Sequence, residues 1–245
     1  MSIPALTVRP ILHTGHTADW LRLLAALDAE TVSAIPEWTE VELGLGGRLA
    51  LHSCLACELY PDSREGGVDL GFETDDLDGF ASAVTPTSGM IVELVDAPHG
   101  RAVRVVGRDG LAFHVDERAA GPASARRTSW VKQLWVSTDV AAAAADLEAL
   151  GLHTRWATTN GRGIELAAAE GGVLVHIADA GTIGATVELD VADLGTAHKA
   201  LLDAGFAHDV IDETNGRTLK VTMPGWSSPL WVVQEDDDPV GVVRP

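Results

Sequence analysis

Apolar and polar residues alternate along three short segments of the chain, and each segment ends at an aspartate: Asp76, Asp139 and Asp193. This alternation is typical of a strand with one buried face. An aspartate after such a strand can accept hydrogen bonds from the first free amides of a helix. The pattern predicts helices over residues 77–84, 140–150 and 194–204. Gly151 and Gly205 directly follow the last two and are typical helix stops.

The same order of elements recurs about every sixty residues. A turn followed by a short apolar strand ends, in succession, at His52, His114, His176 and Trp231, which are 62, 62 and 55 residues apart. A fainter first copy of the helix covers residues 18–27. Each copy is interpreted as a strand, a helix and three strands, and repeats of this length indicate a repeated structural unit. The sequence therefore predicts four modules, over residues 6–60, 66–117, 130–180 and 183–235.

A segment of small and polar residues separates the second module from the third. Residues 118–129 show neither strand nor helix periodicity, so they are interpreted as a linker. The linker divides the chain into a first domain over residues 1–117 and a second over 130–238, followed by a tail over 239–245. The acidic residues after Gln234 repel one another, and the end of the chain is therefore expected to be solvated or loosely docked.

The four modules resemble the vicinal oxygen chelate superfamily, which includes glyoxalase I, bleomycin- and fosfomycin-resistance proteins and extradiol dioxygenases. The most specific stretches are residues 70–78 and 109–115, which look like the helix-entry and last-strand motifs of that family. The resemblance covers nearly the whole chain. It implies an α+β fold of two glyoxalase-like domains, each built of two βαβββ modules that form a curved mixed sheet around a cleft.

The resemblance also implies a divalent metal ion in the first cleft, held by residues of first and last strands. The positions that match are His52, Asp69 and His114. The first strand lacks the expected His or Gln early on, so His13, which lies later, is the nearest fourth candidate. Two histidines and a carboxylate suit Zn, Fe, Mn or Ni. Glyoxalases have Glu in the last strands instead, and these residues could also be ordinary surface or hydrogen-bonded side chains.

The second half has different residues at the corresponding positions: Gln133, His176, Thr186 and Trp231. Thr and Trp do not hold a divalent cation, so this half is expected to be metal-free. Five of the seven tryptophans follow residue 129, which favours an aromatic site for an organic ligand. Strand alternation places Gln133 with Trp135 on one face, and the predicted ligand-binding set is Gln133, Trp135, His176 and Trp231. Alternatively, some of these indoles fill an interface between the halves.

Composition narrows the classes of partner. The chain of 245 residues has 17 basic and 36 acidic residues, a formal net charge of −19, so nucleic acids and anionic membrane surfaces are disfavoured. No apolar run approaches the roughly 18–20 residues that span a bilayer, and the first residues do not resemble a signal peptide. We therefore expect a cytoplasmic protein, monomeric or homodimeric. Cys54 and Cys57, the only Cys-x-x-Cys, are interpreted as reduced thiols in a loop.

A glycine-arginine step begins one strand in each of three modules, at Arg101, Arg162 and Arg217. These arginines could meet an anionic substrate or could pair with surface carboxylates. Neither a nucleophile-elbow motif nor a glycine-rich phosphate loop is present.

Three functional hypotheses remain open. One is a metal-dependent lyase, isomerase or dioxygenase that acts on a small oxygenated molecule. Another is a metal-free protein that sequesters an antibiotic or a hydrophobic metabolite, and the acidic surface suits a cationic one. The third is a module that has lost its chemistry and serves in protein interactions, because the fold alone does not decide function.

Overall fold

The computed structural model describes residues 2–44, 46–54, 64–97, 100–118, 129–178, 182–213, 216–235 and 240–245. The predicted order of a strand, a helix and three strands occurs four times within them. The first module contains β1 (Thr7–Val8), β2 (Ile11–Thr14), α1 (Thr17–Ala26), β3 (Glu30–Ile35), β4 (Trp38–Glu42) and β5 (Arg48–Ser53). The second contains β6 (Val68–Asp69), β7 (Gly71–Thr74), α2 (Leu77–Ala83), β8 (Ile91–Ala97), β9 (Gly100–Val106) and β10 (Ala112–Glu117).

The second half repeats this order. The third module contains β11 (Ser129–Ser137), α3 (Val140–Ala149), β12 (His153–Thr158), β13 (Gly163–Ala167) and β14 (Gly172–Ile177). The fourth contains β15 (Gly184–Val191), α4 (Leu194–Asp203), β16 (His208–Glu213), β17 (Gly216–Val221) and β18 (Leu230–Glu235), and a short strand β19 (Val242–Val243) follows. The predicted α+β class and βαβββ modules are confirmed.

The helix starts follow the predicted capping pattern. Asp76 accepts a hydrogen bond from the Gly79 amide at 2.8 Å, Asp139 from the Ala142 amide at 2.9 Å, and Asp193 from the Thr196 amide at 2.6 Å. In the fainter first copy, His16 stands at this position and its side chain makes no capping bond. The two helix-stop glycines, Gly151 and Gly205, have φ of +98° and +81°, which only glycine adopts without strain.

Third and fourth modules share one curved mixed sheet, with strands in the order β16-β17-β18-β15-β11-β14-β13-β12-β19. The two first strands, β11 and β15, lie antiparallel at its centre. We call this sheet the C-terminal cup. The tail joins it, because Val242 and Val243 pair with β12 and the Thr159 amide donates to the Gly241 carbonyl at 2.8 Å. At these residues the tail is docked more firmly than expected.

First and second modules form the equivalent N-terminal cup, in two sheets of five strands ordered β3-β4-β5-β2-β6 and β1-β7-β10-β9-β8. The antiparallel pairing of β1 with β7 and that of β2 with β6 have the same register, because Val8 lies opposite Phe72 and Leu12 lies opposite Val68. The Arg9 amide, between them, donates to the Gly71 carbonyl at 2.8 Å. The break falls at Pro10, which has no amide hydrogen to donate. β1–β2 and β6–β7 are therefore two interrupted central strands.

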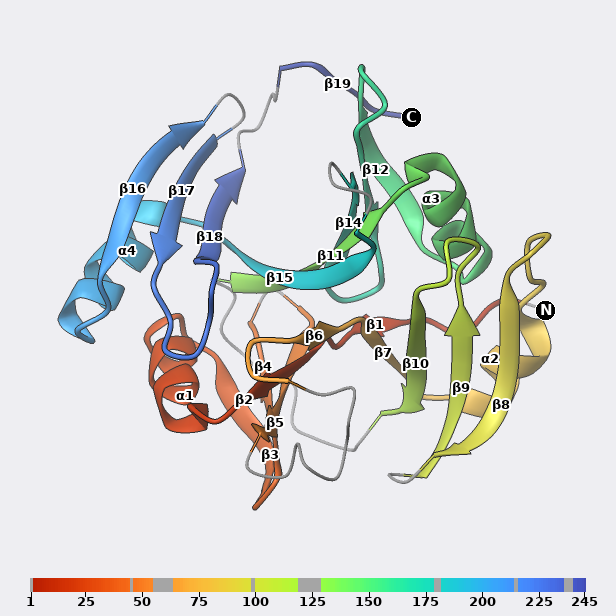
Figure 1. Ribbon diagram of the computed structural model, residues 1–245, viewed down its shortest axis with the longest axis horizontal. Helices are drawn as coiled ribbons and strands as arrows, with labels where there is room; N and C mark the ends of the chain where they lie inside the picture. Colours follow the sequence, from red (N-terminus) through yellow and green to blue (C-terminus); the bar gives the residue numbers. More distant parts are fainter. Residues whose placement is uncertain are drawn as a thin grey trace.

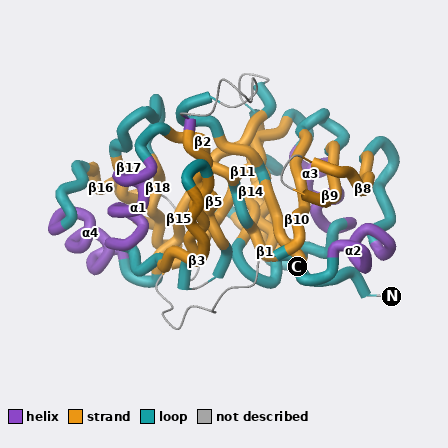
Figure 2. The backbone as a smooth tube through the Cα atoms, turned by 90° about the horizontal axis from the view of Figure 1, so that it is seen from below, coloured by secondary structure: helices purple, strands orange, loops and turns teal. Residues whose placement is uncertain are grey.

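The two cups lie back to back, and the helices cover the outer sides of their arms (Figures 1 and 2). Backbone hydrogen bonds join the central strands of the two cups, among them those from the Val8 amide to the Glu170 carbonyl at 2.8 Å, from the Val131 amide to the Gly46 carbonyl at 3.1 Å and from the Ala169 amide to the Leu6 carbonyl at 3.0 Å. A single cluster of buried apolar side chains includes residues from all four modules. Division into two domains therefore stays a prediction. Residues 119–128 of the expected linker and Cys57 lie outside the described residues, and Ser129 already belongs to β11.

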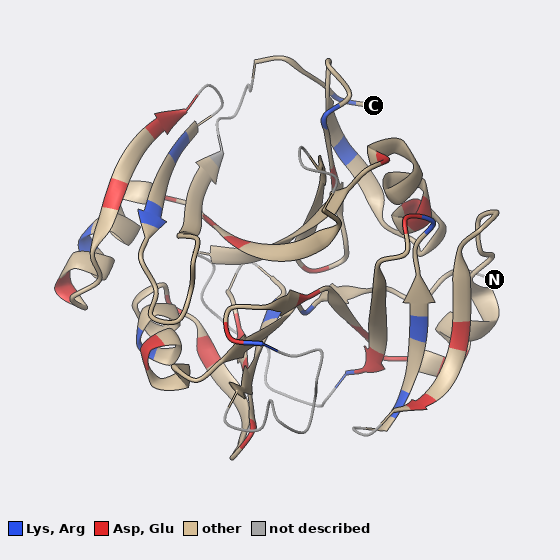
Figure 3. Ribbon diagram, in the orientation of Figure 1, with Lys and Arg blue, Asp and Glu red and all other residues tan. Residues whose placement is uncertain are grey.

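No helix among the described residues is long and apolar enough to cross a membrane. Acidic side chains are spread over both cups, as the composition leads one to expect (Figure 3).

Candidate functional site

The concave face of the N-terminal cup is polar, although the sheet is largely buried. Side chains of directly paired residues point to the same face of a sheet. The pairing registers place on this face His13 and Arg9, with residues from five neighbouring strands: Trp38, Glu40, Arg48, His52, Asp69, Glu73, His114 and Asp116. The alternate residues, such as Val8 and Leu12, belong to the apolar core. All four residues predicted as metal ligands therefore share one face.

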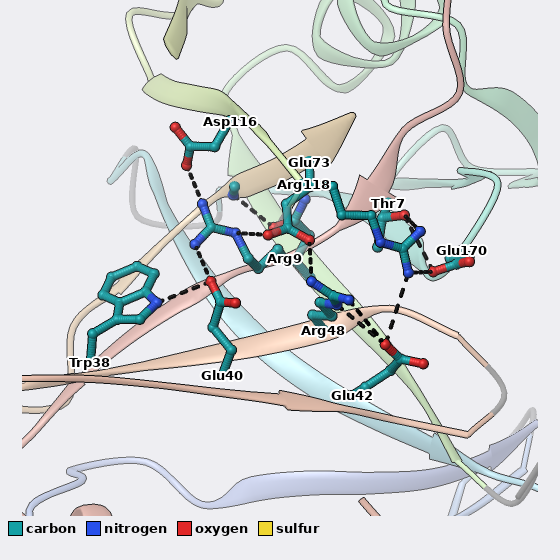
Figure 4. A network of polar contacts seen from close by, with 12 residues as sticks. Thr7, Arg9, Trp38, Glu40, Glu42, Arg48, Glu73, Asp116, Arg118 and Glu170 are labelled. Atoms are coloured by element: carbon teal, nitrogen blue, oxygen red, sulfur yellow. Dashed lines mark hydrogen bonds and ion pairs between the residues drawn. The ribbon is translucent and has the colours of Figure 1, made fainter. Parts of the chain in front are cut away.

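Two arginines and their carboxylate partners fill the deep part of this face (Figure 4). Arg9 contacts Glu40 at 3.1 Å and Glu73 at 3.3 Å, and it also pairs with Asp116. Arg48 reaches Glu73 at 3.4 Å. The arginine side chains are at most 4% exposed, so this ion-pair network is shielded from solvent. It leaves the deep part of the cup occupied by the protein's own charges.

Glu73 has an altered acidity in this network. The pKa of Glu73 is raised to about 7, mainly by burial and also by the neighbouring Glu40, against the opposing effects of Arg9 and Arg48. The group therefore changes its charge near neutral pH.

Nearer the ends of the strands, three of the predicted residues contact one another. The Nδ1 atoms of His13 and His52 lie 3.1 Å apart, and His13 Nε2 lies 2.8 Å from an Asp69 carboxylate oxygen. The contacts arise because β2 is flanked by β5 and β6, with His13 directly opposite His52. Backbone hydrogen bonds hold the turn before β6 to β2, since the His13 amide donates to the Gly67 carbonyl at 2.9 Å.

The protonation pattern of the three residues follows from these contacts. A carboxylate accepts hydrogen bonds, so Nε2 of His13 is assigned the hydrogen and its Nδ1 carries a lone pair when the ring is neutral. Burial lowers the pKa of His52, and the neighbouring His13 lowers it further, while Glu37 and Asp69 act in the opposite direction. His52 is accordingly held neutral at pH 7, which is the form that binds metals.

The donor geometry fits a metal ion shared by the two imidazoles. Nitrogen ligands at about 2.0–2.1 Å from one zinc ion lie about 3.0–3.4 Å from each other, and the two Nδ1 atoms are 3.1 Å apart. Metal-binding histidines commonly donate their other ring hydrogen to a carboxylate, and His13 does so to Asp69. If a metal were bound in this way, Asp69 would orient His13 and would not itself be a ligand.

The predicted three-ligand centre is corrected by the structure. Among the described residues, no group of three or more His, Cys, Asp or Glu side chains could hold a metal ion. His114 of β10 lies opposite Gly71 of β7, and Gly71 is two residues after Asp69 in the sequence. His52, Asp69 and His114 thus share a face without forming one site, and His13 occupies the central place.

In the C-terminal cup, a buried lysine takes the position of Arg9. The Lys132 ammonium lies 2.9–3.2 Å from carboxylate oxygens of Glu165, Glu188 and Asp190. Thr186, whose type led to the expectation of a metal-free half, lies on the same face as Glu188.

Two of the four predicted ligand-binding residues point away from this cup. Gln133 and Trp135 share a face, as alternation predicts, but it is the face opposite Lys132. Gln133 accepts a hydrogen bond from the Gly71 amide at 3.1 Å. Trp135 is fully buried, donates to Asp109 at 2.8 Å and packs edge-on against Phe113. The prediction that both line a ligand cup is wrong, because they fill the interface between the two halves.

The other two, His176 and Trp231, do lie on the concave face of the C-terminal cup. Trp231 is half-buried, and the Lys220 ammonium lies 4.2 Å from its ring centroid. His176 is half-buried, with Nδ1 at 3.0 Å from the Ile177 carbonyl oxygen. Their role in ligand binding stays a prediction.

The repeated arginines act mainly at the surface. Arg101 pairs with Asp78, and Arg217 donates to Asp212 at 3.1 Å, both as exposed pairs. For Arg101 and Arg217, this matches the alternative that they pair with surface carboxylates.

Comparison with solved structures identifies the architecture. An Mn(II)-bound glyoxalase from Novosphingobium aromaticivorans matches 95% of this chain and 82% of its own, with a TM-score of 0.64 and 14% identity. The match to a catechol 2,3-dioxygenase covers 98% of this chain and 91% of the dioxygenase, with a TM-score of 0.60 and 13% sequence identity. The match to the 2,3-dioxygenase LapB from Pseudomonas sp. KL28 covers 97% of this chain and 93% of LapB, with a TM-score of 0.59 and 12% sequence identity. The chain has the vicinal oxygen chelate fold.

No protein-family model and no curated protein matches the sequence. Within this vicinal oxygen chelate fold, sequence reasoning missed the buried cations Arg9 and Lys132. The sequence did contain a signal for them. Each is a single basic residue that follows a valine in a predicted central strand, in Val8-Arg9 and in Val131-Lys132. Such residues are rarely buried unless they are paired.

Proposed function

We propose that the N-terminal cup binds a divalent metal ion through Nδ1 of His13 and Nδ1 of His52, and acts on a small oxygen-containing molecule. The observation that carries the proposal is the separation of 3.1 Å between these two atoms. The Mn(II)-bound glyoxalase of the same fold supports a metal in this type of cup. The reaction class stays open among lyase, isomerase and dioxygenase.

Each of the three residues has a distinct part in this proposal. His13 and His52 provide the ligand nitrogens, and Asp69 fixes the ring of His13 by accepting the hydrogen of Nε2. The lowered pKa of His52 keeps its lone pair available at neutral pH. A bound divalent ion would supply a Lewis acid that polarises a carbonyl or hydroxyl oxygen of the substrate. With two protein ligands, the remaining coordination positions are available to water and substrate.

The depth of the site follows from the ion-pair network. Arg9, Glu40 and Glu73 fill the deep part of the concave face, so a ligand is expected to bind nearer the strand ends, beside His13 and Trp38. The indole of Trp38 lies 6.0 Å, between ring centroids, from the His52 ring. Its ring offers an apolar surface for the organic part of a small substrate.

A second candidate is a metal-free binding protein. It is favoured by the absence, among the described residues, of any three side chains that could hold a metal. The net charge of −19 would attract a cationic ligand. In this case a hydrogen bond between the two Nδ1 atoms joins His13 and His52, and no metal ion lies between them.

Metal titration of untagged protein distinguishes the candidates. Isothermal titration with Mn²⁺ and Zn²⁺ should give one ion per chain, and His13→Ala or His52→Ala should abolish that binding. Asp69→Asn should weaken it about 10- to 100-fold, the usual effect of losing an orienting carboxylate. His153→Ala, an exposed histidine of the other half, is the matched control and should bind like wild type. Binding that is absent, or equally strong in His13→Ala and His52→Ala, would favour the metal-free candidate.

A further inference from the structure

A loop of the fourth module reaches across to the first half of the chain. Residues 222–229 join β17 to β18, and in Figure 1 this loop extends down to α1. Its ends are fixed in the apolar core, because Met223 and Leu230 are both buried. Between them, the half-buried Trp226 packs edge-on against Trp20 of α1, with the ring centroids 5.0 Å apart. The loop is therefore held by both halves of the molecule.

This loop fits closely against the turn that precedes β6. A Cβ placed on Gly66 would lie 3.1 Å from the Gly225 carbonyl oxygen and 3.1 Å from Trp226 Cδ1. In the other direction, a Cβ placed on Gly225 would collide with the Glu65 carboxylate. Both glycines have a φ of +76°, in the region that favours glycine. The two turns thus meet with little room for a side chain on either one.

The turn before β6 holds His13 and leads directly to Asp69. The Gly66 amide donates to the His13 carbonyl at 2.9 Å, and the His13 amide donates to the Gly67 carbonyl at 2.9 Å. Asp69 follows two residues later, and its carboxylate lies 2.8 Å from His13 Nε2. The Asp69 side chain is 60% exposed, so its surroundings enclose it little. Its direction therefore depends on the backbone of this turn and of the short strand β6.

We infer that Trp226 of the second half is a positioning residue for the contact between Asp69 and His13, because it holds the turn at residues 64–67 in place. Keeping an exposed side chain in one geometry costs conformational entropy. The cost falls when the backbone beneath the side chain is already fixed. The polar pair belongs to the first half, and a loop of the second half completes its support.

The first half supports the same turn independently, so the effect of Trp226 is partial. Glu65 accepts hydrogen bonds from Thr14 Oγ1 at 3.0 Å and from the Gly15 amide at 2.5 Å. These bonds do not involve Trp226. The indole acts through its ring, since its buried Nε1 makes no hydrogen bond to any described residue. Phenylalanine at this position should therefore provide most of the same support.

Ring ¹⁵N NMR of the histidines, recorded at a single pH without metal, tests the inference directly. In wild type, the neutral His13 ring should have its hydrogen at Nε2, as the contact with Asp69 requires. In Trp226→Ala, both tautomers of His13 should be present, because Asp69 is no longer held in one direction. Trp226→Phe should restore the wild-type pattern, and a pattern in Trp226→Phe like that of Trp226→Ala would contradict the role assigned to the ring.

Metal affinity is a second readout, and this part of the inference rests on the proposed function. Titration with Zn²⁺ should give a Kd roughly threefold to tenfold weaker for Trp226→Ala than for wild type. The loss is smaller than the 10- to 100-fold effect of removing an orienting carboxylate, because Trp226 acts one contact further away. If wild type binds no Zn²⁺, the proposed function fails, while the NMR pattern of His13 still decides the inference.

A tryptophan of the second half that lies outside this loop gives the matched control. Trp156, half-buried in β12, is replaced in Trp156→Ala, which should leave the His13 signals unchanged. Trp226→Leu takes the place of Trp226→Ala in both measurements if the alanine variant does not fold. The inference is overturned if His13 keeps its hydrogen at Nε2 as fully in these Trp226 variants as in wild type. It is also overturned if Trp156→Ala changes the His13 ring as much.

Discussion

Buried charge is the dominant feature of this protein at the scale of single residues. Arg9, Arg48 and Lys132 are each at most 4% exposed and each contacts two or three carboxylates. Removing one member of such a cluster leaves the others without compensation and typically costs about 3–5 kcal/mol. These residues consequently restrict where a ligand can bind, as well as holding the central strands together.

The acidity of Glu73 gives a pH prediction for the N-terminal network. Its pKa is raised from 4.5 to about 7, mainly by burial, so folding favours the protonated form. The contribution of Glu73 to stability is therefore full below its unfolded pKa and is lost as the pH rises through about 7. Wild type should lose stability relative to Glu73→Gln by about 1 kcal/mol per pH unit between pH 5 and pH 7. Urea unfolding of both proteins at pH 5, 6 and 7 measures this, and a difference that does not change with pH would contradict it.

The sequence predicted which residues meet in the N-terminal cup better than how they are arranged. His52 and Asp69 were predicted from strand positions, and both contact His13, which had been only the nearest fourth candidate. The repeat spacing located His114 on the correct face but could not show that a register offset of two residues separates it from Asp69. Pairing registers depend on contacts between strands distant in sequence, which a local pattern does not contain.

At the scale of elements, local signals sufficed for the helices. Asp76, Asp139 and Asp193 each cap the helix that follows, because a capping bond spans only three residues. Strand faces were harder. Lys132, Gln133 and Trp135 of β11 are all buried, since the strand is covered by the cup on one side and by the other half on the other. Alternation gave the pairing of Gln133 with Trp135 but not the direction in which they point.

A capping prediction belongs at this scale. Asp139→Ala should destabilise the protein by about 1 kcal/mol, because the Ala142 amide loses its partner at the start of α3. Thr138→Ala, at the preceding exposed position, is the matched control and should change stability by less than about 0.5 kcal/mol. Chemical denaturation at pH 7 measures both, and equal effects of the two variants would show that the cap adds nothing.

At the scale of the whole molecule, the back-to-back packing of the cups depends on polar contacts as well as on the apolar core. Asp146 of α3 is fully buried and accepts hydrogen bonds from the backbone amide and Nε of Arg108, at 3.0 and 2.9 Å, and from Thr87. Trp135 packs against Phe113 across the same interface. Both contacts join the second module to the third, so the two halves are expected to unfold together.

Removing the Asp146 carboxylate tests this coupling. Asp146→Ala leaves the donors of Arg108 and Thr87 without their acceptor and should cost about 3 kcal/mol. Asp203→Ala, an exposed aspartate that pairs with Lys199, should cost less than about 1 kcal/mol. Calorimetry should show one transition for wild type at a higher temperature than for Asp146→Ala. An unchanged melting temperature in Asp146→Ala would contradict the assigned role.

The proposed metal site is tested most directly by anomalous X-ray diffraction from crystals grown with Mn²⁺ or Zn²⁺. Data collected above and below the absorption edge of the metal locate it without reference to protein density. The account predicts one peak per chain, between Nδ1 of His13 and Nδ1 of His52 and about 2.0–2.2 Å from each when the metal is zinc. Asp69 should remain hydrogen-bonded to His13 Nε2. A peak confined to other residues, or the absence of any peak at saturating metal, would contradict it.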